Sequence, residues 1–509
     1  MSQQTANALT RRTLLRTCGI GIIALGTPLI YAKANPKATP HKKNVLLLYV
    51  DDLRPELKCY GKSTIISPNI NKLAARSVLL NKAYCQIPVC MPSRTSTMSG
   101  KYPRRPAGHL RQLLHKDLPS LPGHFKANGY DTISIGKIYH HNDDDAASWT
   151  KRYTDTFWEK EYACDGWSSG YQLEKNRKAV KSKNKYSRPL TECVDAPDNA
   201  YPDGRTANNA IAQLKAHAKS KTPLFLAAGF YRPHLPWAVP KKYWDLYKRN
   251  EIQLAKKQSF PKGAIGRSTW CDLRHYNDAE VNGADLRKSH TPKSFPVLSE
   301  AKQRELIHAY QASVSFVDAQ IGRILDALDT LGMTENTTVI LCGDHGWHLG
   351  EYKLWAKVTC YEESLRVPLI VAAPGVAKPA KTDGLTELVD IYPTLCELSG
   401  LTIPPHVEGT SMVPLLKDPT RKWKTAAFSI WVGSQSMRTE RYRLTVFKKA
   451  MPKGSLLQLP TTGRHELYDY KTDPAGNTNI ATNPKNKALL NRLLVRLKAG
   501  PKGARPKKE

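Results

Sequence analysis

The chain has 509 residues, enough for one large domain with an appendage or about three average domains. Its formal net charge is +33 and its isoelectric point about 9.7, which favours a polyanionic partner or substrate. Charge alone leaves nucleic acid, anionic lipid and sulfated polysaccharide open, as well as a basic surface that only aids solubility. No recognisable nucleic-acid-binding module accompanies the charge, so nucleic-acid binding is not expected.

The N-terminus is typical of an export signal. The twin arginines Arg11 and Arg12 precede an apolar stretch over 18–32, and an A-x-A cleavage motif ends at Ala34. The apolar stretch is short and interrupted by glycines, which argues against a stable membrane span. We predict a Tat-type signal peptide over 1–34 and export by the Tat translocase to the periplasm or exterior of a bacterial cell. A retained N-terminal anchor is the alternative.

The ten cysteines show no C-x-x-C spacing, so no zinc or dithiol redox motif is visible. Oxidation of some of them is compatible with an exported protein. Cys164 and Cys193 flank a polar, lysine-rich insert and form the candidate disulfide pair.

A continuous apolar run over 44–50 predicts a strand buried on both faces, as in parallel α/β sheets. The run ends in Asp51 and Asp52, and two adjacent carboxylates repel each other unless a cation lies between them. The carboxyl edge of an open α/β sheet is where ligands bind. The pair therefore indicates a cation site, with a turn-capping role as the alternative. A helix is expected to begin near Pro68.

Residues 90–94 read Cys-Met-Pro-Ser-Arg and are followed by a polar run to Lys101. Pro92 discourages helix before it, so we expect a helix to open with Ser93 as its N-cap. Cys90 then precedes the positive end of the helix dipole beside Arg94, a place that favours an anion or a polarised oxygen. A purely structural cysteine is the alternative.

These residues resemble the signature of type I sulfatases: Cys90-x-Pro-Ser-Arg94, with Gly100 ten residues after the cysteine. In that family the cysteine is oxidised to formylglycine, whose aldehyde is hydrated to a gem-diol. The resemblance implies maturation by a formylglycine-generating or an anaerobic sulfatase-maturating enzyme. The opening Val-Asp51-Asp52-Leu-Arg-Pro is similar to the iduronate-2-sulfatase-like subgroup, in which the two aspartates bind calcium.

Residues 130–136 predict a second buried strand, which delivers Lys137 and His140. Residues three apart can converge on one site. The spacing resembles the sulfate-binding lysine and the formylglycine-orienting histidine of the family, and a surface lysine with a satisfied histidine is the alternative. The polar region 142–203 is interpreted as a surface insert, and 206–218 as an amphipathic helix.

A third strand over 223–230 leads to Tyr231, Arg232 and His234. Prolines on both sides hold His234 in extended backbone, which suits proton transfer or sulfate binding; an ordinary turn histidine is the alternative. The pattern is again similar to the family, although Tyr231 stands where the iduronate-type subgroup often has His. Region 241–298 is interpreted as an insert beside the pocket, and residues 299–331 as a core helix ended by a glycine.

A fourth strand over 337–342 ends in Asp344 and His345. Together with Asp51 and Asp52, Asp344 gives an oxygen-rich set that suits Ca²⁺ better than Zn²⁺. His345 is an unusual calcium ligand, but the iduronate-type enzymes have it there. By the same resemblance Lys357 is the lysine that binds the sulfate.

The C-terminal part is predicted to be a smaller α+β subdomain. Short antiparallel strands are expected over 428–431, 442–447 and 466–470, and a closing helix over 489–497. The expected organisation is a signal peptide (1–34), a catalytic domain (35–418), a C-terminal subdomain (419–498) and a basic, disordered tail (499–509).

The resemblance, which spans nearly the whole mature chain, implies an alkaline-phosphatase-like α/β fold and sulfate-ester hydrolysis. Cys90, as formylglycine hydrate, is expected to attack sulfur, with His140 a base for release of the sulfate and either His234 or Lys357 protonating the leaving alcohol. Arg94, Lys137 and Lys357 are expected to balance developing negative charge. The expected Ca²⁺ ligands are Asp51, Asp52, Cys90, Asp344 and His345, and the expected substrate contacts are Trp347, Arg232 and His348.

The expected substrate is a sulfated oligo- or polysaccharide, either uronate-containing or of algal type. Three alternatives remain open from the sequence: phosphate or phosphonate ester hydrolysis on the same fold, arylsulfatase or choline sulfatase activity, and a non-catalytic glycan-binding homologue with Cys90 unmodified.

Overall fold

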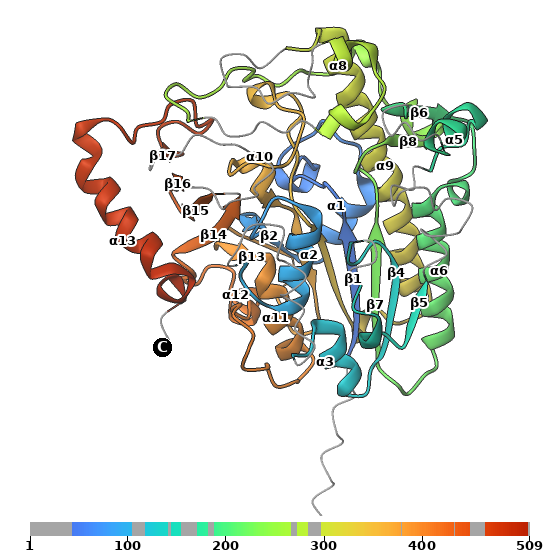
Figure 1. Cartoon of the computed structure of the whole chain (residues 1–509). Coiled ribbons are helices and arrows are strands. Elements are labelled where there is room, and N and C mark those ends of the chain that lie inside the picture. The colour runs from blue at the N-terminus through green and yellow to red at the C-terminus, as the bar shows by residue number, and fades with distance from the viewer. Residues whose placement is uncertain are drawn as a thin grey trace, which may run out of the picture. The chain divides into compact units, whose positions relative to one another are not determined.

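A computed structural model describes residues 43–103, 118–140, 144–153, 170–181, 188–265, 272–283, 297–377, 379–431, 433–447 and 464–506 (Figure 1). The predicted signal peptide over 1–34 lies outside these residues, and so does Cys164, while Cys193 is exposed. Among the described helices, none combines the length and the hydropathy that crossing a membrane requires.

The central element is an eight-stranded mixed sheet. Strands β9, β1, β7, β4 and β5 are parallel neighbours, whereas β11 runs antiparallel to both β9 and β2. Four strands predicted from apolar runs are confirmed as β1, β4, β7 and β9. In sheet order the strands are β12 (Ala380–Thr382), β2 (Val78–Leu80), β11 (Leu369–Ala372), β9 (Thr337–Gly343), β1 (Asn44–Val50), β7 (Leu224–Phe230), β4 (Asp131–Gly136) and β5 (Lys151–Tyr153).

Strand β1 shows why an unbroken apolar run is needed in the middle of this sheet. Leu46, Leu48 and Val50 pack into one hydrophobic cluster, while the alternate residues Leu47 and Tyr49 pack into another on the opposite face. Successive side chains of a strand point to opposite faces, so a strand covered on both sides must be apolar at every position.

Helices cover both faces of the sheet (Figure 1). The cluster on one face contains residues of α1 (Pro68–Ala74), α6 (Pro202–His217) and α9 (Glu300–Thr330), as the periodicity over 299–331 predicts. The other cluster contains residues of α2 (Cys90–Ser99), α3 (Leu121–Ala127), α11 (Ile391–Leu398) and α12 (Val413–Lys417).

The remaining described elements are short and lie in the connections. The helices are α5 (Glu174–Lys181), α7 (Lys241–Trp244), α8 (Ala279–Gly283) and α10 (Glu362–Leu365). Two small sheets pair β10 (Arg366–Val367), β3 (Ala83–Tyr84) and β13 (Thr386–Glu387), and β6 (Thr191–Val194) with β8 (Trp237–Pro240).

The C-terminal part contains a four-stranded antiparallel sheet and a long helix. Strands β14 (Ala426–Trp431), β15 (Ser434–Thr439), β16 (Tyr442–Phe447) and β17 (His465–Asp469) follow one another in the sheet, and α13 (Lys487–Ala504) packs on β14. The predicted boundary after residue 418 falls between α12 and β14, within the compact unit Lys42–Glu509.

Helix α13 extends beyond its predicted end and into the segment for which the sequence predicts a disordered tail. The backbone leaves helical geometry at Gly500 and the helix continues to Ala504, which is buried. The Thr425 amide donates to the Ala504 carbonyl, and the Arg505 guanidinium donates to the Glu408 carbonyl. These contacts with distant segments order residues 499–506, and local composition gives no sign of them.

Candidate active site

The two aspartates predicted as a cation site form a tight turn at the end of β1. Asp52 has a φ of 58°, a left-handed conformation that is unfavourable for a residue with a side chain. Three contacts hold it: the Asp51 amide donates to the Phe230 carbonyl, the Asp52 amide donates to Asp344 Oδ1 at 3.1 Å, and the Tyr310 hydroxyl donates to the Asp52 carbonyl at 2.8 Å. The turn is therefore imposed by neighbouring strands and by α9.

Helix α2 presents Cys90 at its first position, with Val89 as the N-cap. The prediction of Ser93 as N-cap is wrong. Pro92 stands in the first turn, where the missing N–H has no intrahelical acceptor to lose. The Ser93 hydroxyl instead donates to the Asp344 carbonyl and so ties the helix to the end of β9.

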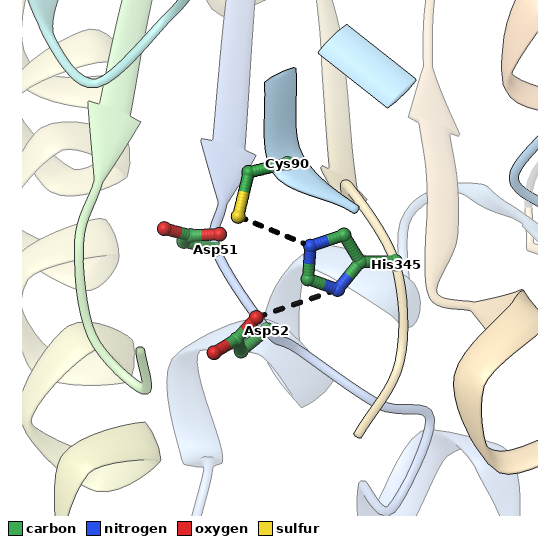
Figure 2. Close-up of side chains that lie close together, drawn as sticks. All are labelled: Asp51, Asp52, Cys90 and His345. Carbon is green, nitrogen blue, oxygen red and sulfur yellow. Dashed lines mark hydrogen bonds and ion pairs between the residues drawn. The ribbon is translucent and has the colours of Figure 1, made fainter. Parts of the chain in front are cut away.

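Four buried residues gather ligand atoms within 4.8 Å of one another: Asp51, Asp52, Cys90 and His345 (Figure 2). His345 Nδ1 lies 3.0 Å from the carbonyl oxygen of the next residue and must donate to it. The Nε2 atom is then the imidazole acceptor, and it lies 3.3 Å from Cys90 Sγ.

Two carboxylate oxygens in this group, Asp51 Oδ1 and Asp52 Oδ2, are buried without a hydrogen-bond partner among the described residues. Such atoms are costly unless something satisfies them. Carboxylate oxygens and one imidazole nitrogen form a donor set that fits a hard divalent cation such as Ca²⁺.

Asp344, the other predicted ligand, lies beside this group and organises it. Its Oδ1 accepts from the amides of Asp52 and His345 at 3.1 and 2.9 Å, and its Oδ2 accepts from Arg94 Nε at 2.8 Å. The carboxylate thus connects the turn after β1, the end of β9 and helix α2.

Three cations converge on the acidic residues from separate elements. Lys137 forms an ion pair with Asp51, and Lys357 Nζ lies 2.9 Å from Asp52 Oδ1 and 3.3 Å from Cys90 Sγ. Arg94 lies 3.7 Å from Asp51 in addition to its bond with Asp344, and its guanidinium stacks on the Tyr49 ring. The structure therefore brings together Cys90, Arg94, Lys137 and Lys357 as the sequence predicts.

The buried charges shift one another's protonation. Although burial opposes ionisation, Lys137 and Arg94 hold the pKa of Asp51 well below its usual value. Burial and Asp51 raise the pKa of the Cys90 thiol to about 11. Burial is the largest cause of this rise, although Lys137 and Lys357 act against it, and the thiol as such is a poor nucleophile.

His234 lies in the loop after β7 and is buried. Its amide donates to the Tyr231 carbonyl and closes a turn, so the extended backbone predicted from the flanking prolines is wrong. Its Nδ1 donates to the Leu235 carbonyl, which leaves Nε2 as the acceptor. Burial and the nearby Lys357 and Lys137 hold the pKa of His234 well below its usual value, so the imidazole is neutral. His140 is half-buried at the end of the segment that carries Lys137, and its role stays a prediction.

Two glycines allow the strand ends to come close enough for this arrangement. A Cβ on Gly229 would lie 2.0 Å from the Lys137 carbonyl oxygen, and one on Gly136 would lie 2.2 Å from the Gly229 carbonyl oxygen. Gly136 also has a φ of 71°. Their small size positions Lys137 against the end of β7 and hence beside Asp51.

The three predicted substrate contacts are buried side chains, and their role stays a prediction. Trp347 packs edge-to-face on Trp237, and His348 Nε2 lies 2.9 Å from the Thr359 hydroxyl. Arg232 donates to the Ala238 and His234 carbonyls. None of them offers an exposed face for a sugar ring in this structure.

Tyr231 is a site residue that sequence reasoning did not assign. Its buried ring lies 4.6 Å from Lys137 Nζ and 5.3 Å from the His234 ring. Such proximity of an ammonium to a ring favours a fixed lysine position. The only signal in the sequence is its departure from the histidine often found there in the iduronate-type subgroup.

The sulfatase family model matches residues 43–401, and the model of the C-terminal part of N-sulphoglucosamine sulphohydrolase matches residues 350–502. The chain belongs to the sulfatase family. It is 30% identical to iduronate 2-sulfatase of Homo sapiens over 91% of this chain and 96% of the relative, and 32% identical to a sulfatase of Formosa agariphila over 89% and 85%. The protein is therefore a sulfuric ester hydrolase.

The solved structure of a 2-O GAG sulfatase superposes with a TM-score of 0.66 at 21% identity, over 90% of this chain and 91% of that chain. This likeness confirms the predicted alkaline-phosphatase-like fold of the sulfatase, with its large mixed sheet between helices and its C-terminal sheet.

Proposed function

We propose that this sulfatase hydrolyses sulfate esters of a sulfated glycan, using a formylglycine formed from Cys90 and a bound Ca²⁺. The observation that carries the proposal is the buried convergence of three cations and three carboxylates around Cys90, with two carboxylate oxygens left without hydrogen-bond partners.

Charge balance supports an anionic substrate. Arg94, Lys137 and Lys357 offset Asp51, Asp52 and Asp344, so the protein charges at the site sum to about zero. A divalent cation would raise the sum to about +2, which suits a monoanionic sulfate ester and a second negative charge that develops during attack.

The cation would be held by Asp51, Asp52 and His345, with position 90 at its edge and Asp344 as a further proposed ligand. When bound, Ca²⁺ supplies positive charge that polarises the sulfate and favours ionisation of the neighbouring hydrate. The formylglycine hydrate at position 90 supplies the nucleophilic oxygen.

The remaining roles follow from where the protein's own charges lie. Arg94 and Lys137 orient the sulfuryl oxygens and balance their growing charge. Lys357 is favoured over His234 as the donor of the leaving-group proton. Although burial opposes it, Asp52 and Cys90 hold the pKa of Lys357 well above its usual value, whereas neutral His234 has no proton at Nε2 to give.

A glycan substrate is supported by the relatives named iduronate 2-sulfatase and ulvan-active sulfatase and by the net charge of +33. The proposal includes Tat-dependent export through the signal at residues 1–34 and maturation of Cys90 by a formylglycine-generating or anaerobic sulfatase-maturating enzyme before export.

The test is a release assay on matured protein from the native host. Inorganic sulfate would be quantified from sulfated uronate-containing and algal oligosaccharides, and from aryl sulfate and choline sulfate, and phosphate from a matched phosphoester. We expect sulfate release to be fastest from a glycan and to be abolished by Cys90→Ala. Comparable turnover of the phosphoester, or preference for aryl or choline sulfate, would refute the glycan assignment.

A further inference from the structure

The C-terminal end of the chain is rich in basic residues and poor in acidic ones. Residues 474–508 contain nine Lys and Arg and no Asp or Glu, whereas the whole chain has 77 basic and 44 acidic residues. Five of the nine lie on α13, and all five are exposed: Lys487, Arg492, Arg496, Lys498 and Lys502. We call this set the α13 basic face.

The opposite side of α13 packs against the C-terminal sheet. Leu493 is buried, and Leu489, Leu490, Leu494 and Leu497 pack against a cluster that includes residues of β14 to β17. At about 100° per residue over 487–499, these leucines occupy one side of the helix and Lys487, Arg492, Arg496 and Lys498 the other, while Lys502 follows the break at Gly500. Figure 1 shows α13 on the outer side of this sheet.

The positive charges on this face are not compensated within the described part of the chain. No ion pair there involves a residue of the α13 basic face. Arg496 donates to the Thr425 carbonyl, a neutral acceptor. Five like charges within one helix repel one another, so the face gains from an anionic partner.

We propose that the α13 basic face binds the sulfated polysaccharide chain as an auxiliary site, separate from the site at Cys90. The inference rests on the proposed function, because it takes the substrate to be a sulfated glycan. The continuous helical stretch 487–499 has 13 residues and is about 20 Å long, enough to lie along several sugar rings. Several simultaneous sulfate contacts raise the local concentration of the polymer at the enzyme.

A membrane surface is the less favoured occupant. Helices that lie in a bilayer interface bury an apolar face in it, and the leucines of α13 already pack on the sheet. Val495, 69% exposed, is the one large apolar side chain on the outward side of the described helix. A sulfated polysaccharide needs only the exposed positive charges of the α13 basic face in order to bind, and no apolar surface.

The test compares two charge-matched variants of the full, matured enzyme. The first carries Lys487→Gln, Arg492→Gln, Lys498→Gln and Lys502→Gln. The control removes four exposed lysines elsewhere: Lys58→Gln, Lys62→Gln, Lys219→Gln and Lys221→Gln. Each variant is measured for the salt concentration that elutes it from immobilised heparin, and for kinetics on a long sulfated polysaccharide and on a short sulfated oligosaccharide.

We expect the α13 variant to elute at lower salt than the control, and its KM for the polysaccharide to rise at least about fivefold while kcat/KM for the oligosaccharide stays unchanged. Equal elution and equal KM for the two variants would overturn the proposal. Loss of binding to vesicles of anionic lipid, with polysaccharide binding intact, would overturn it in favour of a membrane. Absence of wild-type activity on every glycan refutes the proposed function instead. In that case retention on immobilised heparin still measures binding by the α13 basic face.

Discussion

Buried Arg54 and half-buried Glu351 form an ion pair that connects the two halves of the site. Arg54 follows the turn at Asp51 and Asp52, and its guanidinium donates to both carboxylate oxygens of Glu351 at 2.8 and 3.2 Å and to the Trp347 carbonyl at 3.0 Å. Glu351 lies in the loop that leads to Lys357 and also accepts from the Leu349 amide at 2.7 Å. Glu351→Gln removes the charge and keeps the shape of the side chain.

The contacts of Glu351 set the size of the stability loss that we expect for Glu351→Gln. Although burial opposes it, Arg54 lowers the pKa of Glu351 from 4.5 to about 2. That difference corresponds to about 3 kcal/mol of stability at neutral pH. Breaking one partner of a buried pair costs about 3–5 kcal/mol by mutational precedent, which agrees. Because the folded-state pKa is depressed, the contribution is present above the unfolded-state pKa of 4.5 and is lost as the pH falls toward 2.

The assay is urea unfolding of wild type and Glu351→Gln across the pH range in which both fold. We expect a loss of about 3 kcal/mol that is constant from pH 5 to 8 and shrinks below about pH 4.5. The double variant Arg54→Met/Glu351→Gln should be more stable than Glu351→Gln alone, because it no longer buries a guanidinium that has lost Glu351 and keeps only the half-buried Glu56 as an ion-pair partner among the described residues. A loss under about 0.5 kcal/mol, or one independent of pH in that lower range, would refute the reasoning.

Two further predictions concern activity. Tyr231→Leu should lower kcat about two- to thirtyfold, whereas Tyr231→Phe should lower it little, because the phenylalanine keeps the ring that lies 4.6 Å from Lys137 Nζ. Equal losses of kcat for the two variants in steady-state assays would assign the effect to the hydroxyl. Chelation of divalent cations should abolish sulfate release and weaken thermal stability, and Ca²⁺ should restore both better than Zn²⁺, because the donors at Asp51, Asp52 and His345 are mainly oxygen. Full activity after exhaustive chelation would contradict the cation site.

The framework of the site was predictable because its residues follow long apolar strands. Buried strands in a parallel sheet leave a strong pattern, and their carboxyl ends meet at one edge, so Asp51, Lys137 and Asp344 were expected to converge. In the structure Lys137 forms an ion pair with Asp51, and Arg94 pairs with both Asp51 and Asp344.

Features that depend on distant partners were not predictable. Strand β15 is polar, and its Arg438 is buried by an ion pair with Glu362, far away in the sequence. Trp347 and His348 have side chains typical of sugar contacts, but Trp237 and Thr359 pack with them in the interior. Ser93 is a good N-cap by type, yet its hydroxyl is used by Asp344. In each case a tertiary contact outweighs the local preference.

The measurement that tests the central claim most directly is the mass of the tryptic peptide over residues 83–94, prepared from protein made in its native host. We predict a peptide lighter by the difference between a thiol and an aldehyde at Cys90, with the aldehyde trapped by a hydrazide. A peptide with an intact thiol at Cys90 in that host, from protein that releases sulfate, would contradict the account.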